Sequence, residues 1–336
     1  MPFDPLAYEP YHELHGRPNV VVDGSPTDGT VVTLTHWPGF ATPPGTEADL
    51  SAAMVLRYLR NGVDLHSPAT LVSNNHFDQD GLAGVYALTA PADALDRQAS
   101  LVDLASAGDF ATFRDRRAAR ASMVVAAWAD LTRTPFDLPA DDADRGAALY
   151  RESLARLPEL LDHPERHRDL WADEDAALAA SERLVAGGEV TVTEHPDVDL
   201  AVFDVPDHIA LVGGHRFAHE WVTGLHPMAV NNATERFAVL ARRGRSYQLT
   251  YRYEGWVQYR SRPVFARRDL AVLGAELDRD ETSGGTWRYD GSGGLAPSFR
   301  LLGADESSIA PDRFLDRLVA FLASAPPDWD PFPAEG

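Results

Sequence analysis

The chain has 336 residues, a formal net charge of −21 and no cysteine, which excludes thiol nucleophiles, iron–sulfur clusters, thiolate zinc sites and disulfides. All 30 basic residues are arginine, which excludes Schiff-base lysines, and the acidic balance argues against duplex nucleic acid as a partner because that binding depends on neutralising phosphates. The sequence shows no secretory signal and no run of about 18 apolar residues that would predict a membrane span, so we expect a cytoplasmic protein.

Residues 1–113 alternate short apolar runs with helical patterns. The predicted strands cover residues 20–22, 30–34 and 69–72. The predicted helices are one that follows a cap at residues 46–49 and ends at Gly62, and two over residues 82–88 and 92–107. Such alternation is typical of a mostly parallel sheet covered by helices. We therefore predict an N-terminal α/β metal-binding domain over residues 1–113.

The rest of the chain divides into a helical stretch and a second α/β region. Residues 114–187 form a predicted helical connector, with apolar residues three and four apart over residues 123–131, 149–161 and 173–186. Residues 188–336 form a predicted smaller, arginine-rich α/β substrate domain. Its predicted elements cover residues 189–193, 200–205, 209–212, 268–280 and 312–323, with a hairpin over residues 246–262.

A His-x-Asp-x-Asp motif follows the strand predicted at residues 69–72. His76, Asp78 and Asp80 are spaced two residues apart, and full extension would separate the outer two by roughly 13 Å, which is too far for one ion. The Asp-Gln-Asp-Gly sequence favours a turn, and the curled segment would offer one imidazole and two carboxylates. That donor set suits Mn²⁺, Fe²⁺ or Mg²⁺ better than structural zinc. The alternative is a solvated turn with the imidazole bonded to the backbone.

The same segment resembles the first motif of the DHH phosphoesterase superfamily, which includes RecJ-like exonucleases, nano-RNases and family II pyrophosphatases. In the RecJ-like branch a strand ends in an acid or histidine, followed by x-Asp-x-Asp-Gly and a helix. His76, Asp78, Asp80 and Gly81 match that spacing. The resemblance is specific over residues 71–85 and loose elsewhere.

Three further segments carry the rest of the resemblance, in a rearranged order. Asp23, after three valines, resembles the aspartate that bridges two metals in that superfamily. His36, in Leu-Thr-His-Trp, resembles a degraded Asp-His-His triplet, and Asp109 resembles the last metal-ligand aspartate; an intact Asp-His-His triplet does not occur in the chain. The resemblance implies that these residues join the His-x-Asp-x-Asp motif around a pair of Mn²⁺ ions, or of Mg²⁺ ions. The alternative makes Asp23 and Asp109 turn or cap residues and His36 a packed loop histidine.

Positive charge is concentrated in the C-terminal part of the chain. Residues 236–268 contain nine arginines and one acid, Glu254. Arginine forks bind phosphate or carboxylate bidentately. We expect Arg252, Arg260 and Arg262 to bind the substrate, because we predict that they lie on strands among aromatic residues. The alternative is pairing with acidic helices of the same chain.

A glycine-rich segment offers a second candidate for substrate binding. The superfamily often carries an Arg-Ser strand, a helix and a Gly-Gly-His loop in a C-terminal substrate domain. Residues 259–262 and the later Gly-Gly-Thr follow that order, with Thr286 in the place of the histidine. A literal Gly213-Gly214-His215 occurs earlier, and we expect it to contact substrate. The alternative is a turn with a surface histidine.

Together these patterns predict a divalent-metal-dependent phosphoesterase-like hydrolase, in which water activated by two metals attacks a small or short anionic substrate such as a short nucleotide. His76, Asp78 and Asp80 would be its catalytic residues. One alternative is an actinobacterial-type protein of the same fold that binds metal and anion without turnover, which the missing Asp-His-His favours. Another is a purely structural interaction module. A homo-oligomer is compatible with each of these hypotheses.

Overall fold

The computed structural model describes residues 4–209 and 224–332, and it has the mixed α/β fold that the sequence predicts. Its contacts define two compact units. Unit 1 is Met1–Asp175 with Tyr259–Arg262, and unit 2 is Ala176–Gln258 with Pro263–Gly336. In the described part of the chain, none of the helices has the length and apolar character needed to cross a membrane.

A four-stranded parallel sheet forms the centre of unit 1, with the order β1-β4-β2-β3. The strands are β1 (Ala7–Tyr8), β2 (Asn19–Val22), β3 (Thr30–Leu34) and β4 (Leu71–Ser73). All four residues of β2 are buried, as expected for the inner strand of a parallel sheet that is covered on both faces. Because the strands are parallel, β2, β3 and β4 end at the same edge of the sheet.

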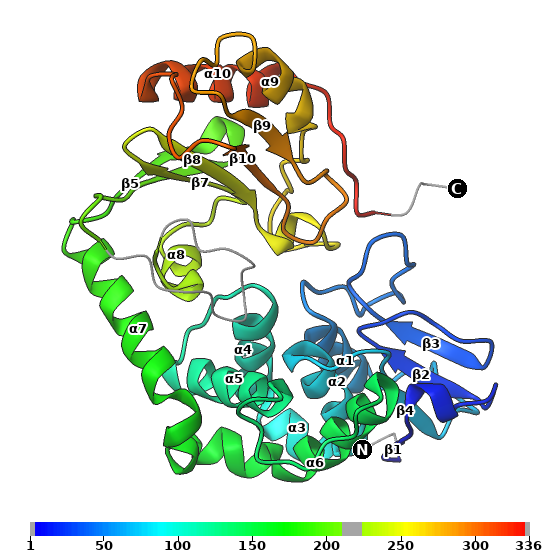
Figure 1. Cartoon of the computed structure of the whole chain (residues 1–336). Helices are drawn as coiled ribbons and strands as arrows, with labels where there is room; N and C mark the ends of the chain where they lie inside the picture. Colours follow the sequence, from blue (N-terminus) through cyan, green and yellow to red (C-terminus); the bar gives the residue numbers. More distant parts are fainter. Residues whose placement is uncertain (1–3, 210–223, 333–336) are drawn as a thin grey trace. The chain divides into compact units, whose positions relative to one another are not determined.

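Helices pack beside this sheet, and α1 and α2 contact its strands (Figure 1). The helix predicted after residues 46–49 begins at Ser51 and ends before Gly62, which has the left-handed φ of 67° that favours glycine. The helices of unit 1 are α1 (Ser51–Asn61), α2 (Gln79–Thr89), α3 (Pro91–Asp96), α4 (Gln98–Asp109), α5 (Arg116–Ala129), α6 (Asp142–Asp162) and the first part of α7 (Arg168–Ala186).

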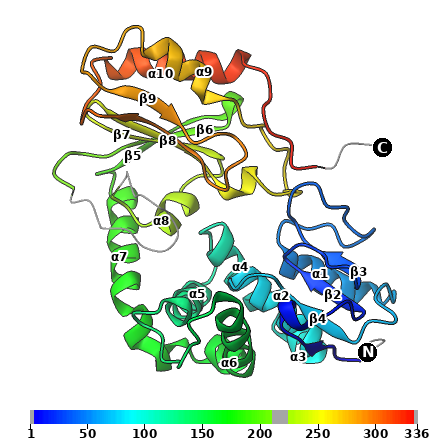
Figure 2. The ribbon, with the colours of Figure 1, turned by 45° about the vertical axis from the view of Figure 1, so that its right-hand side comes forward.

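Unit 2 is built on a six-stranded mixed sheet with the order β5-β6-β7-β8-β10-β9, in which β6 and β7 are parallel and the other pairs antiparallel. Its strands are β5 (Thr191–His195), β6 (Leu200–Asp204), β7 (Ala238–Arg243), β8 (Ser246–Tyr251), β9 (Thr286–Tyr289) and β10 (Ser298–Leu302). Its helices α9 (Leu270–Leu277) and α10 (Pro311–Ser324) cover one face, and α8 (Pro227–Asn232) and the end of α7 cover the other (Figure 2).

Two parts of this architecture differ from the sequence-based expectation. The hairpin over residues 246–262 is wrong, because β8 pairs with β7 across a turn at Gly244, and the chain after β8 forms a short 3₁₀ turn at Tyr253–Gly255. The residues predicted as a separate connector pack largely into unit 1, and the boundary between the units lies inside α7, after Asp175. The strand predicted at residues 209–212 lies almost wholly outside the described residues.

A buried arginine holds the loops of unit 2 together. The Arg267 side chain is 1% exposed, and burial lowers the pKa of its guanidinium to about 10. Its two terminal nitrogens donate hydrogen bonds of 2.5–2.9 Å to four backbone carbonyl oxygens, those of Ser292, Gly294, Arg252 and Leu295. This arginine therefore satisfies backbone groups that lie outside any helix or strand ladder.

Replacing Arg267 should lower the stability of unit 2 and leave the stability of unit 1 unchanged. Because Arg267→Met leaves four carbonyls without their donor, we expect a loss of about 3 kcal/mol in the free energy of unfolding. Calorimetry measures this loss, and Arg288→Met, at an exposed position of β9, is the matched control. Equal melting curves for the two variants would contradict the assignment.

Candidate metal centre

The loops after three neighbouring strands bring charged residues to one edge of the parallel sheet. Asp23 directly follows β2, His36 comes two residues after β3, and His76 comes three residues after β4. Two helix ends supply the other carboxylates. Asp78 is the N-cap of α2, Asp80 lies in its first turn and Asp109 ends α4. The six residues predicted as metal ligands thus come together in unit 1.

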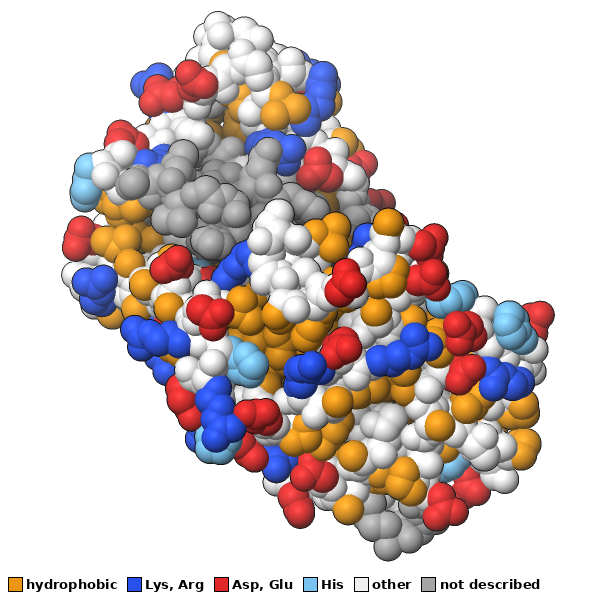
Figure 3. Space-filling model, turned by 60° about the horizontal axis from the view of Figure 1, so that its bottom comes forward, with side chains coloured by type: hydrophobic (Ala, Val, Ile, Leu, Met, Phe, Trp, Pro, Cys, Tyr) orange, Lys and Arg blue, Asp and Glu red, His pale blue; other side chains and the backbone are white. Residues whose placement is uncertain are grey.

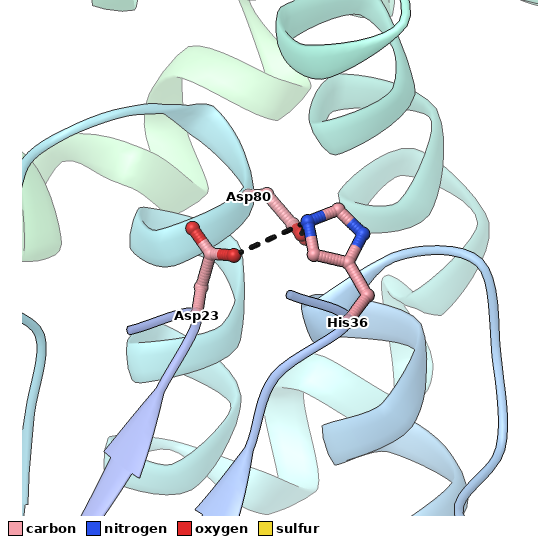
Figure 4. A group of neighbouring side chains, drawn as sticks. All are labelled: Asp23, His36 and Asp80. Carbon is pink, nitrogen blue, oxygen red and sulfur yellow. Dashed lines mark ion pairs between the residues drawn. The ribbon is translucent and has the colours of Figure 1, made fainter. Parts of the chain in front are cut away.

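The inner part of the cluster is built around the His36 imidazole. Its Nε2 lies 3.4 Å from Asp23 Oδ1, 3.8 Å from Asp80 Oδ2 and 3.5 Å from Asp109 Oδ2. Figure 4 shows Asp23, His36 and Asp80 turned toward one another, and all three are buried. His36 Nδ1 is 2.6 Å from the carbonyl oxygen of Asp49. Because a carbonyl oxygen can only accept, Nδ1 donates to Asp49, and Nε2 is the ring nitrogen that faces the carboxylates.

The outer part of the cluster shares Asp23 with the inner part. His76 Nε2 lies 2.7 Å from Asp78 Oδ2 and 3.3 Å from Asp23 Oδ2. One oxygen of Asp23 therefore faces His36 and the other faces His76. The outer group is more open, with the side chains of His76 and Asp78 about a third exposed, and the Trp37 ring lies 5.4 Å from the His76 ring. Two groups, Asp23–His36–Asp80 and Asp23–His76–Asp78, each place their ligand atoms close enough together to hold a metal ion.

The backbone at Asp23 adopts a conformation that few non-glycine residues tolerate. Its φ is 50°, in the left-handed region, which costs an L-residue about 1 kcal/mol or more. The next residue is Gly24, where a Cβ would lie 2.0 Å from Asn75 Oδ1. Asn75 Oδ1 also accepts a hydrogen bond of 3.3 Å from the Ser25 amide. The loop after β4 therefore fixes the loop that carries Asp23.

The start of α1 holds the buried carboxylates in place. Asp80 accepts hydrogen bonds from the amides of Ser51 and Ala52, at 2.7 and 2.8 Å. The Ser51 hydroxyl donates to Asp23 Oδ1 at 2.8 Å and accepts from the His36 amide at 3.2 Å. Sequence reasoning missed Ser51 because it only placed a helix start there, and a helix start does not reveal which carboxylate its free amides will meet.

Burial and mutual charge set the protonation of the cluster. Desolvation would raise the pKa of Asp23, but the hydrogen bond and charge of His76 and the charge of His36 outweigh it, and the pKa is lowered. The pKa of Asp80 is raised well above its usual range, first by desolvation and then by repulsion from Asp23. Desolvation opposes the charged form of His76, yet attraction by Asp78 and Asp23 raises its pKa to about 11. The carboxylates therefore keep a proton on His76 as a counter-charge.

The segment with Arg260 and Arg262 is attached to unit 1 next to His36. Asp49 accepts hydrogen bonds from the amides of Arg260 and Ser261, at 2.6 and 2.9 Å, and from the Ser261 hydroxyl. The same residue contacts His36 through its carbonyl oxygen. Both arginines lie on a loop rather than on the predicted strands, because β8 ends at Tyr251.

The other predicted substrate ligands are placed differently. Arg252 is buried in unit 2, where its guanidinium pairs with Glu254 and donates to the carbonyls of Asn231 and Thr234. Its substrate role stays a prediction, and the geometry fits a structural one. On the face drawn in Figure 3, arginine and acidic side chains are interspersed. Gly213, Gly214 and His215 lie outside the described residues.

A comparison of the sequence with known families places it in one of them. The chain belongs to a family of unknown function (DUF6687), whose model matches residues 4–333. None of the curated proteins matches the sequence.

The raised pKa of His76 makes a prediction for the metal-free protein. A histidine with a pKa of 6.5 in the unfolded chain and about 11 in the folded chain stabilises the fold fully below pH 6.5 and loses that contribution as the pH rises toward 11. In the presence of a chelator, we therefore expect the melting temperature to fall between pH 7 and 9.5, more steeply than for His76→Gln. His12→Gln, at an exposed histidine, should keep the wild-type slope; the same slope in His76→Gln would disprove the assignment.

Proposed function

We propose that the protein is a divalent-metal-dependent phosphoesterase-like hydrolase that acts on a small or short anionic, phosphate-containing substrate. The observation that carries this proposal is the shared Asp23 carboxylate, whose two oxygens face two different imidazoles at 3.4 and 3.3 Å. An aspartate between two ligand groups could bridge two cations at the spacing of about 3.5–4 Å that two-metal hydrolysis uses. The resemblance of residues 71–85 to the DHH superfamily points in the same direction.

The chemistry of the cluster suits a divalent cation. In the described part of the chain, Asp23 and Asp80 form ion pairs with histidines alone, although both are fully buried. Buried carboxylates are stable when a cation compensates their charge, and for Asp23 the protonated His76 imidazole is such a cation. Mixed carboxylate and imidazole donors favour Mn²⁺, with Mg²⁺ as the second choice.

The residues then have distinct roles. Asp23, His36, Asp80 and Asp109 would hold the inner cation, and Asp23, His76 and Asp78 the outer one. Bound divalent cations would supply activation of a water molecule and compensation of phosphoryl charge. The outer group is the partly exposed one, so we assign substrate entry to that side.

The loop of residues 259–262 would bind the anion. Asp49 fixes its backbone beside His36, so the loop carries Arg260 and Arg262 into the neighbourhood of the cluster. A guanidinium offers two parallel donors to a phosphate or a terminal carboxylate. An otherwise acidic protein with this local arginine pair favours small or short anions over duplex nucleic acid.

Metal binding tests the shared carboxylate directly. We expect the wild type to bind Mn²⁺ in calorimetric titration and to melt at a higher temperature with Mn²⁺ than with a chelator. Asp23→Asn should weaken both binding steps at least 100-fold, whereas His76→Ala should weaken only the outer one. Asp137→Asn, at an exposed aspartate, is the control. Unchanged metal content in Asp23→Asn would refute the centre.

Turnover separates an enzyme from a binding protein of the same fold. With Mn²⁺, we expect hydrolysis of bis-p-nitrophenyl phosphate or of short oligonucleotides. The double change Arg260→Gln and Arg262→Gln should raise KM about tenfold with a smaller effect on kcat, and Arg288→Gln should leave both constants unchanged. Metal binding without turnover of any of these substrates would instead support the non-catalytic alternative.

A further inference from the structure

Two buried polar groups in unit 1 face the metal centre without a hydrogen-bond partner among the described residues. They are the hydroxyl of Tyr150, on α6, and the side-chain amide nitrogen of Asn74, directly after β4. Tyr150 is 1% and Asn74 4% exposed. The orientation of the Asn74 side-chain amide is supported by its oxygen, because Oδ1 accepts a hydrogen bond of 2.8 Å from the His76 amide. Both groups are therefore donors without an acceptor in the protein interior, which is rare.

Both donor atoms lie against the same surface, which is the side-chain-free side of Gly81. A Cβ on residue 81 would lie 2.2 Å from Asn74 Nδ2, 2.7 Å from the Tyr150 hydroxyl and 3.1 Å from Asp78 Oδ1. The glycine thus leaves room for two donors and one carboxylate oxygen. Asp78 Oδ1 is the carboxylate oxygen that borders this space, and a small movement of the Asp78 carboxylate could bring it within reach of both donors.

The orientation of Asp78 depends on few contacts. Its Oδ1 accepts from the Gly81 amide at 2.8 Å, and its Oδ2 is fixed by His76 Nε2 at 2.7 Å. If His76 Nε2 binds a cation, it can no longer donate to Asp78. The carboxylate then loses one of its two fixing hydrogen bonds at the moment when its Oδ2 is needed as a ligand.

We propose that Tyr150 is a positioning residue of the outer group, which together with the Asn74 amide holds Asp78 Oδ1 so that Oδ2 stays directed at a bound divalent cation. This inference rests on the proposed metal centre. Hydrogen-bond donors behind a ligating carboxylate are general features of metal sites, and their removal weakens metal binding by 10- to 100-fold. By this inference α6 contributes a positioning residue to the site, although it contributes none of the predicted ligands.

The variant Tyr150→Phe, with Tyr8→Phe as its control, tests the proposal. The Tyr8 ring stacks on the Tyr150 ring with centroids 5.0 Å apart, and the Phe77 ring lies perpendicular to Tyr150 at 5.2 Å. Both variants therefore lose one hydroxyl from the same aromatic cluster. We expect Tyr150→Phe to weaken about tenfold the outer Mn²⁺ binding step, the one that His76→Ala also weakens, and to leave the inner step unchanged. Tyr8→Phe should bind as the wild type does.

Melting in the presence of a chelator separates positioning from packing. A purely structural hydroxyl would lower the melting temperature of Tyr150→Phe, whereas loss of an unpartnered buried hydroxyl should leave it unchanged or raise it. Unchanged Mn²⁺ affinity of Tyr150→Phe, or an equal loss in Tyr8→Phe, would overturn the positioning role while leaving the metal centre intact. A wild type that binds no Mn²⁺ would overturn the proposed function itself and this inference with it.

Discussion

The carboxylate of Asp23 is the group on which the candidate site depends. It leaves the end of the most buried strand in a left-handed conformation, and its two oxygens face the imidazoles of His36 and His76. If the carboxylate were absent, the inner and outer groups would share no ligand. The parallel sheet makes the arrangement available, because three strand ends meet at one edge and each loop needs only a few residues to reach it.

Holding several carboxylates inside a protein requires compensation, and unit 1 supplies it in two ways. The first amides of α1 bind Asp80, and the Ser51 hydroxyl links Asp23 to the His36 backbone. These contacts orient the carboxylates but do not neutralise them, since the pKa of Asp80 is still raised by burial and by Asp23. The remaining negative charge keeps a proton on His76. A divalent cation would replace that proton and remove the same imbalance with more charge.

The strands and the candidate site residues can be predicted from the sequence more readily than the residues that surround and orient them. The valines of β2 and the cap and glycine around α1 are local signals, so the N-terminal α/β architecture was predictable from them. The convergence of the six candidate residues was predictable because strand ends in a parallel sheet meet at one edge. Ser51, Asp49 and Tyr150 left no such signal, since their contacts join segments far apart in the chain. The prediction of a hairpin over residues 246–262 was wrong. The alternating tyrosines of β8 pack in the core of unit 2, and beyond that strand Arg252 and Glu254 pair with each other.

The arginine-rich stretch shows how charge that is concentrated in the sequence can be divided in the fold. Arg242 pairs with Asp204 and Arg267 binds carbonyls, so these cations serve the structure of unit 2. Residues 259–262 alone within this stretch are grouped with unit 1. They are held there by Asp49, whose side chain binds their backbone and whose carbonyl oxygen fixes the His36 ring. Asp49 thus sets both the orientation of the His36 ring and the position of the loop that carries the two arginines. A displacement of that loop that moves Asp49 would therefore also change the orientation of the His36 imidazole.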